Sequence, residues 1–230
     1  MWQPRKALID GDIFVYRAGF ATNDEPVEEA IKAFDSLVAS AVLDAGCVDY
    51  QVYITGKGNF RYDVAKTAVY KGNRKDASKP VHINALREHA VNEWEAIVSQ
   101  DEEADDLIAI EATRRGILNS IIVSVDKDFL QVPGLFFNPV KKQHITVDAW
   151  SGLFFFYQQI LMGDSADNIM GIKGIGPAKS HKILTGAKDE RELYERCVQQ
   201  YNGDTDRVLE NALLLWLRRE PGQIWEPPVC

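Results

Sequence analysis

The fold is indicated first by Ser120-Ile121-Ile122-Val123-Ser124-Val125-Asp126-Lys127-Asp128, an apolar run that stops at two carboxylates. A second run of this kind, Lys6-Ala7-Leu8-Ile9, stops at Asp10-Gly11-Asp12. Short continuous apolar runs are typical of strands buried on both faces of a parallel sheet. In an open α/β sheet the ligand crevice lies beyond the carboxyl ends of the strands, so the acids at these two ends should meet. The sequence therefore predicts an α/β fold with a mostly parallel central sheet flanked by helices.

A third acidic group, Glu102-Glu103-Ala104-Asp105-Asp106, precedes apolar residues at helical spacing. Glu103 and Asp106 are three residues apart and should share a helical face, with Asp105 beside them. Acids in a first helical turn can simply complement the helix dipole, which is the better interpretation of any one of them. Several acidic groups at one sheet edge, however, repel one another unless cations lie between them. Oxygen donors without a nearby His or Cys favour Mg²⁺ or Mn²⁺ over zinc.

Two further acids lie in Gly163-Asp164-Ser165-Ala166-Asp167-Asn168-Ile169, just before the turn Gly171-Ile172-Lys173-Gly174-Ile175-Gly176-Pro177. Glycines let backbone N–H groups point outward, and a proline suits the first turn of a following helix. Such a turn can bind phosphate through its N–H groups and the positive helix end. By itself the segment is equally typical of a plain helix-turn-helix with two capping aspartates. Beside the other acids, it predicts a phosphate grip next to a metal site.

The chain has 26 Lys and Arg against 34 Asp and Glu, and the resulting net charge of −8 argues as a sum against nucleic acid. The distribution of the charges is more informative than their sum. Basic side chains concentrate between residues 57 and 79, where they alternate with Phe60, Tyr62 and Tyr70. Cations and aromatic rings together suit phosphates and unstacked bases, although a solvated basic loop has the same composition. A second positive group near the glycine turn contains Lys173, Lys179, His181 and Lys182.

Five motifs, in this order, resemble the flap endonuclease or 5′-nuclease family, in particular its phage exonucleases and the nuclease domain of bacterial DNA polymerase I. They are Asp10-Gly11-Asp12, Tyr70-Lys71-Gly72-Asn73-Arg74, Glu103-Ala104-Asp105-Asp106, Asp126-Lys127-Asp128 and Gly163-Asp164-Ser165-Ala166-Asp167-Asn168-Ile169. The resemblance implies a metal-dependent 5′ to 3′ nuclease that acts on branched or 5′-ended DNA and leaves 5′-phosphates. It also implies a helical arch at about 75–102 and a helix-three-turn-helix duplex clamp at 163–184 that often holds K⁺.

The resemblance also assigns roles to individual residues. The first metal would be shared by Asp10, Glu103, Asp105 and Asp126, and the second would be held by Asp128, Asp164 and Asp167. Asp106, which closes the third motif, is included among the expected metal residues. Catalysis is assigned to Lys71 and Arg74, which would orient the scissile phosphate, together with Asp10, Glu103, Asp105 and Asp126. DNA binding is assigned to Tyr70, Lys71, Arg74, Lys173, Gly174, Gly176 and Lys179.

The chain departs from the family pattern at the end of its second predicted strand. Family members usually place an aspartate there, whereas Gln51-Val52-Tyr53-Ile54-Thr55 leads into Gly56 without an acid. One outer metal contact is therefore missing, and Gly56→Asp should lower the Mg²⁺ requirement if the backbone at that position tolerates a side chain. In the arch, apolar spacing predicts one helix over 82–98 that packs its apolar side chains inward.

At 230 residues and 46% hydrophobic composition, the chain can bury a full core. We expect one integrated domain, with a nuclease core at 1–150 and a helical region at 151–230 that contains amphipathic helices over 190–201 and 204–219. No apolar run approaches membrane length, so no membrane partner is expected. Cys47, Cys197 and Cys230 lack metal-ligand spacing, which favours thiols in a reducing, cytoplasmic compartment. A monomer is expected.

The preferred hypothesis is a structure-specific 5′-3′ exonuclease or flap endonuclease that hydrolyses DNA phosphodiesters with two Mg²⁺ or Mn²⁺ ions. Its partners would be DNA with 5′ ends, nicks or flaps, and a separate DNA polymerase. A non-catalytic junction-binding protein of the same fold is the main alternative, and Gly56 favours it. An acid-lined single-strand ribonuclease would share the carboxylates but would not need the glycine turn with Lys173 and Lys179.

Overall fold

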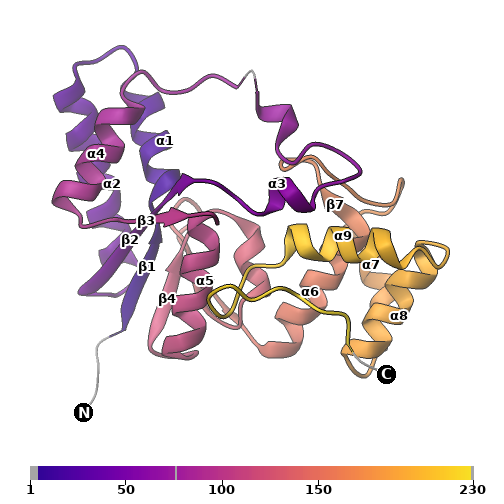
Figure 1. Ribbon diagram of the computed structural model, residues 1–230. Helices are drawn as coiled ribbons and strands as arrows, with labels where there is room; N and C mark the ends of the chain where they lie inside the picture. Colours follow the sequence, from indigo (N-terminus) through magenta and orange to yellow (C-terminus); the bar gives the residue numbers. More distant parts are fainter. Residues whose placement is uncertain (1–4, 76, 229–230) are drawn as a thin grey trace.

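The protein is described by a computed structural model that covers residues 5–75 and 77–228. Its centre is a six-stranded sheet in the order β3-β2-β1-β4-β5-β6 (Figure 1). The strands are β1 (Lys6–Asp10), β2 (Asp49–Lys57), β3 (Ile97–Gln100), β4 (Ser120–Val123), β5 (Gly134–Asn138) and β6 (Gln143–Val147). Within this sheet β6 pairs antiparallel with β5, and the other neighbouring strands are parallel. The predicted mostly parallel α/β sheet is confirmed.

Alternation along the central strands builds a core on each face of the sheet. Ile9, Val52 and Val123 pack with α1 (Gly11–Ala21), α2 (Val27–Asp44) and α4 (Ile83–Glu93). Leu8, Tyr53 and Ile122 point the other way and pack with α5 (Ala104–Arg115). Successive side chains of a strand face opposite sides, so these continuous apolar runs require helices on both faces.

The register of the central strands brings their carboxyl ends to one edge. Ile9 on β1 lies opposite Val52 on β2 and Val123 on β4. Asp10 therefore ends β1 beside the end of β4, and Asp126 lies three residues beyond the end of that strand. This shared edge is where the rule for open α/β sheets places a ligand crevice.

The helix predicted over 82–98 is only partly correct. α4 ends at Glu93, and residues 97–100 form β3, which pairs with the edge of β2. Glu95 has φ 50°, a left-handed conformation that no α-helix continues. Leu86 and Ala90 are buried as expected, whereas Ile97 is 43% exposed. Pairing of residues 97–100 with the edge of β2 satisfies their backbone N–H and C=O groups as well as a longer helix would have done. Helical spacing alone therefore did not determine the structure of these residues.

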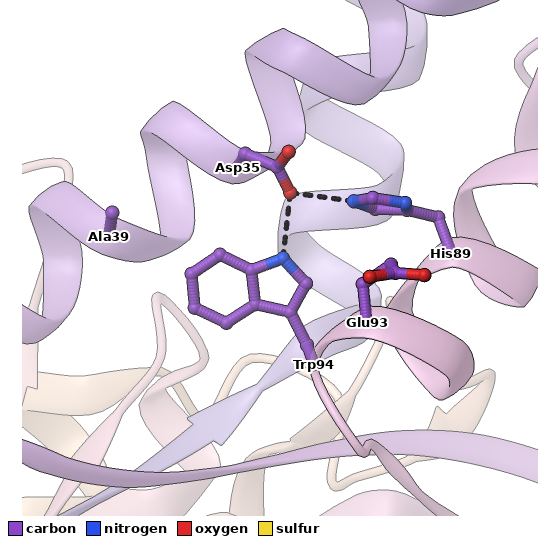
Figure 2. A pocket seen from close by; sticks show the side chains of 5 residues that line it. All are labelled: Asp35, Ala39, His89, Glu93 and Trp94. Carbon is purple, nitrogen blue, oxygen red and sulfur yellow. Dashed lines mark hydrogen bonds and ion pairs between the residues drawn. The ribbon is translucent and has the colours of Figure 1, made fainter.

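A polar contact also fixes α4 against α2. Asp35 on α2 accepts a hydrogen bond of 2.7 Å from Trp94 Nε1, and the same oxygen lies 2.7 Å from His89 Nε2 (Figure 2). The Phe34 ring meets His89 and Trp94 edge-on. α3 (Arg61–Val64) lies at the other side of the molecule, and residues 77–82 run along its top into α4 (Figure 1). Of the range predicted for the arch, 75–102, the described residues contain this segment, α4 and β3.

The C-terminal part of the chain is mainly helical. It contains α6 (Ala149–Met162), the two-residue strands β7 (Gly163–Asp164) and β8 (Ile169–Met170), α7 (Pro177–Leu184), α8 (Glu190–Gln200) and α9 (Thr205–Leu215). The helix expected over 190–201 is present, and the one expected over 204–219 forms but ends at Leu215, where Trp216 turns to an extended conformation. The two helices are capped at their N-termini by Asp189 and Asp204. Trp225 is buried against Phe156 and Tyr157, which makes it a packing anchor.

Within the predicted clamp at 163–184, the glycines have different roles. Gly163 has φ 68°, and a Cβ on it would lie 2.3 Å from the Gly171 backbone N, so this close approach needs glycine. By contrast, Gly174 and Gly176 face open space, and Gly174 has φ 79°. Of the three glycines that suggested a phosphate grip, Gly171 therefore packs closely against Gly163 at the β7–β8 hairpin, and Gly174 and Gly176 remain exposed in the turn before α7.

Candidate metal and nucleic-acid site

A cleft of about 1610 Å³ lies at the carboxyl edge of the sheet, and we call it the edge cleft. It is lined by acids from β1, α5, the end of β4 and the β7–β8 hairpin, and by cations from the 70–79 segment and α4. These include Asp10, Asp12, Glu103, Asp105, Asp126, Asp128, Asp167, Lys71, Arg74, Lys79 and Arg87. The structure thus brings together the acidic groups that the sequence places at separate element boundaries.

Four carboxylates in the edge cleft, Asp10, Asp105, Asp126 and Asp128, form its acidic floor. Burial, followed by the charges of Asp12 and Asp126, raises the pKa of Asp10 to about 7. Burial and the neighbouring charges of Asp10 and Glu103 also hold the pKa of Asp105 well above its ordinary value. Burial and the charge of Asp126 raise the pKa of Asp128 to about 7. The acidic floor carries negative charge that its own side chains do not neutralise.

Few local donors support the acidic floor. Ser124 Oγ donates to Asp10 at 2.9 Å, and Gln159 Nε2 donates to Asp128 at 2.7 Å. Asp126 caps the short 3₁₀ helix η2 (Lys127–Gln131) by accepting from the Asp128 N–H at 2.9 Å. These neutral donors orient the carboxylates but supply no positive charge, so cations remain the natural complement of the site.

Glu103 and Asp167 face cations across the edge cleft. The Tyr70 hydroxyl lies 3.0 Å from Glu103 and 2.9 Å from Asp167, so its single proton can serve only one of them at a time. The Lys71 ammonium contacts Glu103 and lies 3.7 Å from Asp167, and Arg74 pairs with Asp167. The predicted positions of Tyr70, Lys71 and Arg74 beside the acids are thus present in the structure.

The segment that carries these cations is anchored on the β7–β8 hairpin. The Lys71 N–H donates to the Asp167 carbonyl at 2.8 Å, and Lys71 itself has φ 52°. Asn73 Nδ2 donates to the Ser165 carbonyl at 2.8 Å, and Asn168 Nδ2 donates to the Val69 carbonyl at 2.9 Å. The basic segment and the hairpin at the start of the predicted clamp therefore form one connected unit.

Lys127 is a member of this site that the sequence did not single out. Its ammonium lies 2.6 Å from Asp164 and 3.5 Å from Asp128, so it bridges two predicted ligands of the second metal. As the side chains stand in the described residues, no three His, Cys, Asp or Glu converge into a ready-made ion site. The ammonium groups of Lys71 and Lys127 contact carboxylate oxygens of Glu103 and Asp164 instead.

The prediction that Asp106 is a metal ligand is wrong. Both of its oxygens accept from the Arg61 guanidinium, at 2.6 and 2.9 Å, and the backbone N–H groups of Glu103 and Arg218 also donate to it. Burial alone would raise the pKa of Asp106, but the Arg61 charge and its hydrogen bonds outweigh burial and lower it. A capping box with Glu103 turns the Asp106 side chain into the core.

The interpretation of Gly56 as the place of a missing acid is also wrong. A Cβ at Gly56 would lie 1.9 Å from the Ser99 carbonyl oxygen of β3, so no side chain fits, and Gly56→Asp would disrupt the sheet. The preceding residue, Thr55, is the one beside the acids. Its Oγ1 accepts from the Ala104 N–H at 3.2 Å, at the start of α5. The sequence does not show that β2 pairs with β3, and this pairing is what leaves no space for a side chain at Gly56.

Lys173, Gly174, Gly176 and Lys179 lie apart from the edge cleft. They are exposed in the turn before α7 and at its first turn, on a surface that does not line that cleft. Exposed backbone and two lysines at a helix N-terminus suit a phosphate contact at some distance from the acids.

Three comparisons with known proteins bear on this geometry. Residues 5–149 match the model of the 5′-3′ exonuclease N-terminal resolvase-like domain. The chain belongs to the 5′-3′ exonuclease family. A 5′-3′ exonuclease of Mycoplasma genitalium is 30% identical over 208 residues, which cover 77% of this chain and 70% of that protein. A DNA polymerase I of Caldicellulosiruptor bescii is 27% identical over 215 residues, 82% of this chain but only 25% of the polymerase.

Among solved structures, the fold is similar to that of the bacteriophage T5 flap endonuclease in a pseudo-enzyme-product complex with DNA and metal ions. The TM-score is 0.69 at 19% identity, over 92% of this chain and 88% of the phage protein. The family model and the Mycoplasma relative confirm the predicted family and nuclease class. The phage structure confirms the predicted fold class. The roles of individual residues remain predictions.

Proposed function

We propose that this protein is a 5′-3′ exonuclease and flap endonuclease that hydrolyses DNA phosphodiesters by a two-metal mechanism. The observation that carries the proposal is the acidic floor, where burial and mutual repulsion raise the pKa of Asp10, Asp105 and Asp128 opposite Lys71 and Arg74. Such clustered, desolvated carboxylates destabilise a protein unless a cation complements them, and their shifted pKa values are typical of functional sites.

The donors fit hard divalent cations. Carboxylate oxygens from β1, α5 and the end of β4 face one cleft, and oxygen-only sites suit Mg²⁺ or Mn²⁺. We assign Asp10, Glu103, Asp105 and Asp126 to one ion, and Asp128, Asp164 and Asp167 to the other. Bound there, the two ions would supply positive charge to the reacting phosphate and acidify the attacking water.

The cations of the chain would bind the substrate. Lys71 and Arg74 now pair with Glu103 and Asp167, and the approach of a phosphate to the loaded site would offer them a new anionic partner. Lys127 would release Asp164 in the same way. The basic segment therefore neutralises the acids in the free protein and orients the scissile phosphate in the complex.

Duplex binding is proposed at the turn before α7, through Lys173, Gly174, Gly176 and Lys179, with K⁺ as a candidate ion at the same turn. The substrate would be DNA with 5′ ends, nicks or flaps.

A separate DNA polymerase is the proposed protein partner, because the matched part of the polymerase I relative is only 25% of its length. The protein would act as a monomer in the cytoplasm. No helix among residues 5–75 and 77–228 has the length and apolar character of a membrane span.

A second candidate, a branched-DNA-binding protein without turnover, is favoured by the absence of an acid at Thr55, the strand end beside the other acids. The two are separated by incubating end-labelled flap, nicked and blunt DNA duplexes with the protein and Mg²⁺. We expect short 5′-phosphorylated products from the labelled 5′ ends. Retarded but uncut DNA at every Mg²⁺ and Mn²⁺ concentration would favour the binding protein instead.

A further inference from the structure

The carboxylate of Asp12, at the start of α1, is bound to the end of β2. Its Oδ2 accepts from the Thr55 N–H at 2.8 Å, and its Oδ1 accepts from Arg87 Nη1 at 2.7 Å. Arg87 Nη2 also donates to the Thr55 carbonyl. Asp12 thus reaches the strand end that has no acid of its own.

The position of Asp12 is set by tight packing. α1 begins directly after Asp10, and a Cβ at Gly11 would lie 2.7 Å from the Tyr53 carbonyl oxygen, so the first turn of α1 touches β2. On the other side, α4 carries Arg87, which contacts Asp12 and Thr55, and α4 is itself joined to α2 through Asp35 (Figure 2). Asp12 is therefore held at one place rather than exposed on a mobile side chain.

Asp12 also faces the acidic floor. It lines the edge cleft together with Asp10, Thr55 and Arg87. The Asp12 side chain is 24% exposed, so an ion or its water shell can reach it from the cleft.

We propose that Asp12 supplies the outer carboxylate that the end of β2 lacks, so that an acid of α1 completes the metal site in place of one on the strand. The inference rests on the proposed function. Asp12 would act on the first ion by charge and through its water shell, because its two oxygens already bind Thr55 and Arg87. It is a positioning residue in this sense, and outer partners of a metal site commonly change affinity by about 10- to 100-fold.

The competing interpretation is a structural latch, in which the Asp12–Arg87 pair only ties α1 to α4. The two interpretations differ for Arg87→Gln, which breaks the latch and keeps the acid. They also differ for Thr55→Asp, which places an acid at the strand end, where the Ala104 N–H can still donate to it.

The test is a Mn²⁺ titration of the metal-free protein by calorimetry, without DNA, with melting temperatures as a fold control. Asp12→Asn should weaken Mn²⁺ binding by about 10-fold, and Asp12→Asn with Thr55→Asp should restore most of it. Arg87→Gln should not weaken it. Equal weakening by Asp12→Asn and Arg87→Gln would overturn the proposal in favour of the latch.

Thr55→Asp alone covers the case in which Asp12→Asn does not fold, since added charge at the equivalent position should tighten Mn²⁺ binding. An unchanged titration in that variant would contradict the proposal. The proposed function fails separately: wild-type protein that binds no Mn²⁺ would contradict the metal site itself, whereas wild-type binding that Asp12→Asn leaves unchanged would contradict only the role of Asp12.

Discussion

Asp105 and Asp106 are neighbours in the first turn of α5, but one faces the edge cleft and the other faces the core. Burial and the nearby acids keep the pKa of Asp105 well above its ordinary value, whereas Arg61 outweighs burial and keeps that of Asp106 below it. On the cleft side, the acids therefore outnumber the cations that contact them. On the core side, Arg61 and Asp106 bind each other and the backbone of residues 214–218. The same residue type in one motif serves chemistry on one face and stability on the other.

The largest effect should come from removing charge on the cleft side. Asp105→Asn should lower cleavage of flap DNA by about 100-fold or more, because the ion site loses a central carboxylate. The folded protein should melt at the same temperature as wild type or higher, since repulsion with Asp10 and Glu103 is relieved. Product formation on a labelled flap and a thermal melt measure the two effects. Cleavage at the wild-type rate would remove Asp105 from the site.

On the core side the effect should be on folding. Asp106→Asn leaves the Arg61 charge buried without its partner, and loss of one member of a buried pair costs about 3–5 kcal/mol. Urea unfolding measures this loss. Arg114→Ala, which removes an exposed arginine paired with Glu111, is the control and should change little. A similar small change for Asp106→Asn would contradict the difference between the two faces.

Stability of the metal-free protein should fall as pH rises from about 4 to 7. Asp10 and Asp128 have folded-state pKa values of about 7, above the ordinary value of 3.8, so the folded state binds more protons over this window. Melting temperatures in a chelator across that range test the sign. At the alkaline end, Mg²⁺ at a hundredfold excess over its dissociation constant should restore about 2.7 kcal/mol. Asp10→Asn should flatten the pH dependence, and a rise in stability with pH would contradict it.

The smallest effects should come from the cations. Lys71→Ala and Lys179→Ala should each lower the slope of log affinity for DNA against log salt by about one unit. Lys71→Ala should in addition slow cleavage, because Lys71 lies at the acids, whereas Lys179 lies outside the edge cleft. Lys141→Ala, at an exposed position between β5 and β6, is the matched control. Equal effects of all three variants would mean that charge, not position, determines binding.

The sequence predicts the parts of the fold in which pattern and local chemistry agree. The apolar runs of β1 and β4 and the acids that end them were predictable because strand direction and the position of a crevice follow from the topology of a parallel sheet. The later helices were predictable from spacing. The end of α4 was not, because strand pairing decided it.

The errors at the site have a common cause. Helical spacing placed Glu103 and Asp106 on one face, but a buried arginine more than forty residues earlier in the chain determines where the Asp106 side chain points. Gly56 looked like a missing acid because its contact with Ser99 is invisible in the sequence. The roles of Lys127 and Asp12 depend on side-chain contacts between separate elements, for which a single sequence has no signal.

The joint between the basic segment and the β7–β8 hairpin has a consequence for where DNA is cut. Backbone and amide hydrogen bonds tie Lys71 and Asn73 to the hairpin that leads into the turn before α7. Under the proposed function, the part that holds the duplex and the part that orients the reacting phosphate cannot slide past each other. We therefore expect the distance between these two parts to fix the number of nucleotides between the DNA junction and the incision, whatever the DNA sequence.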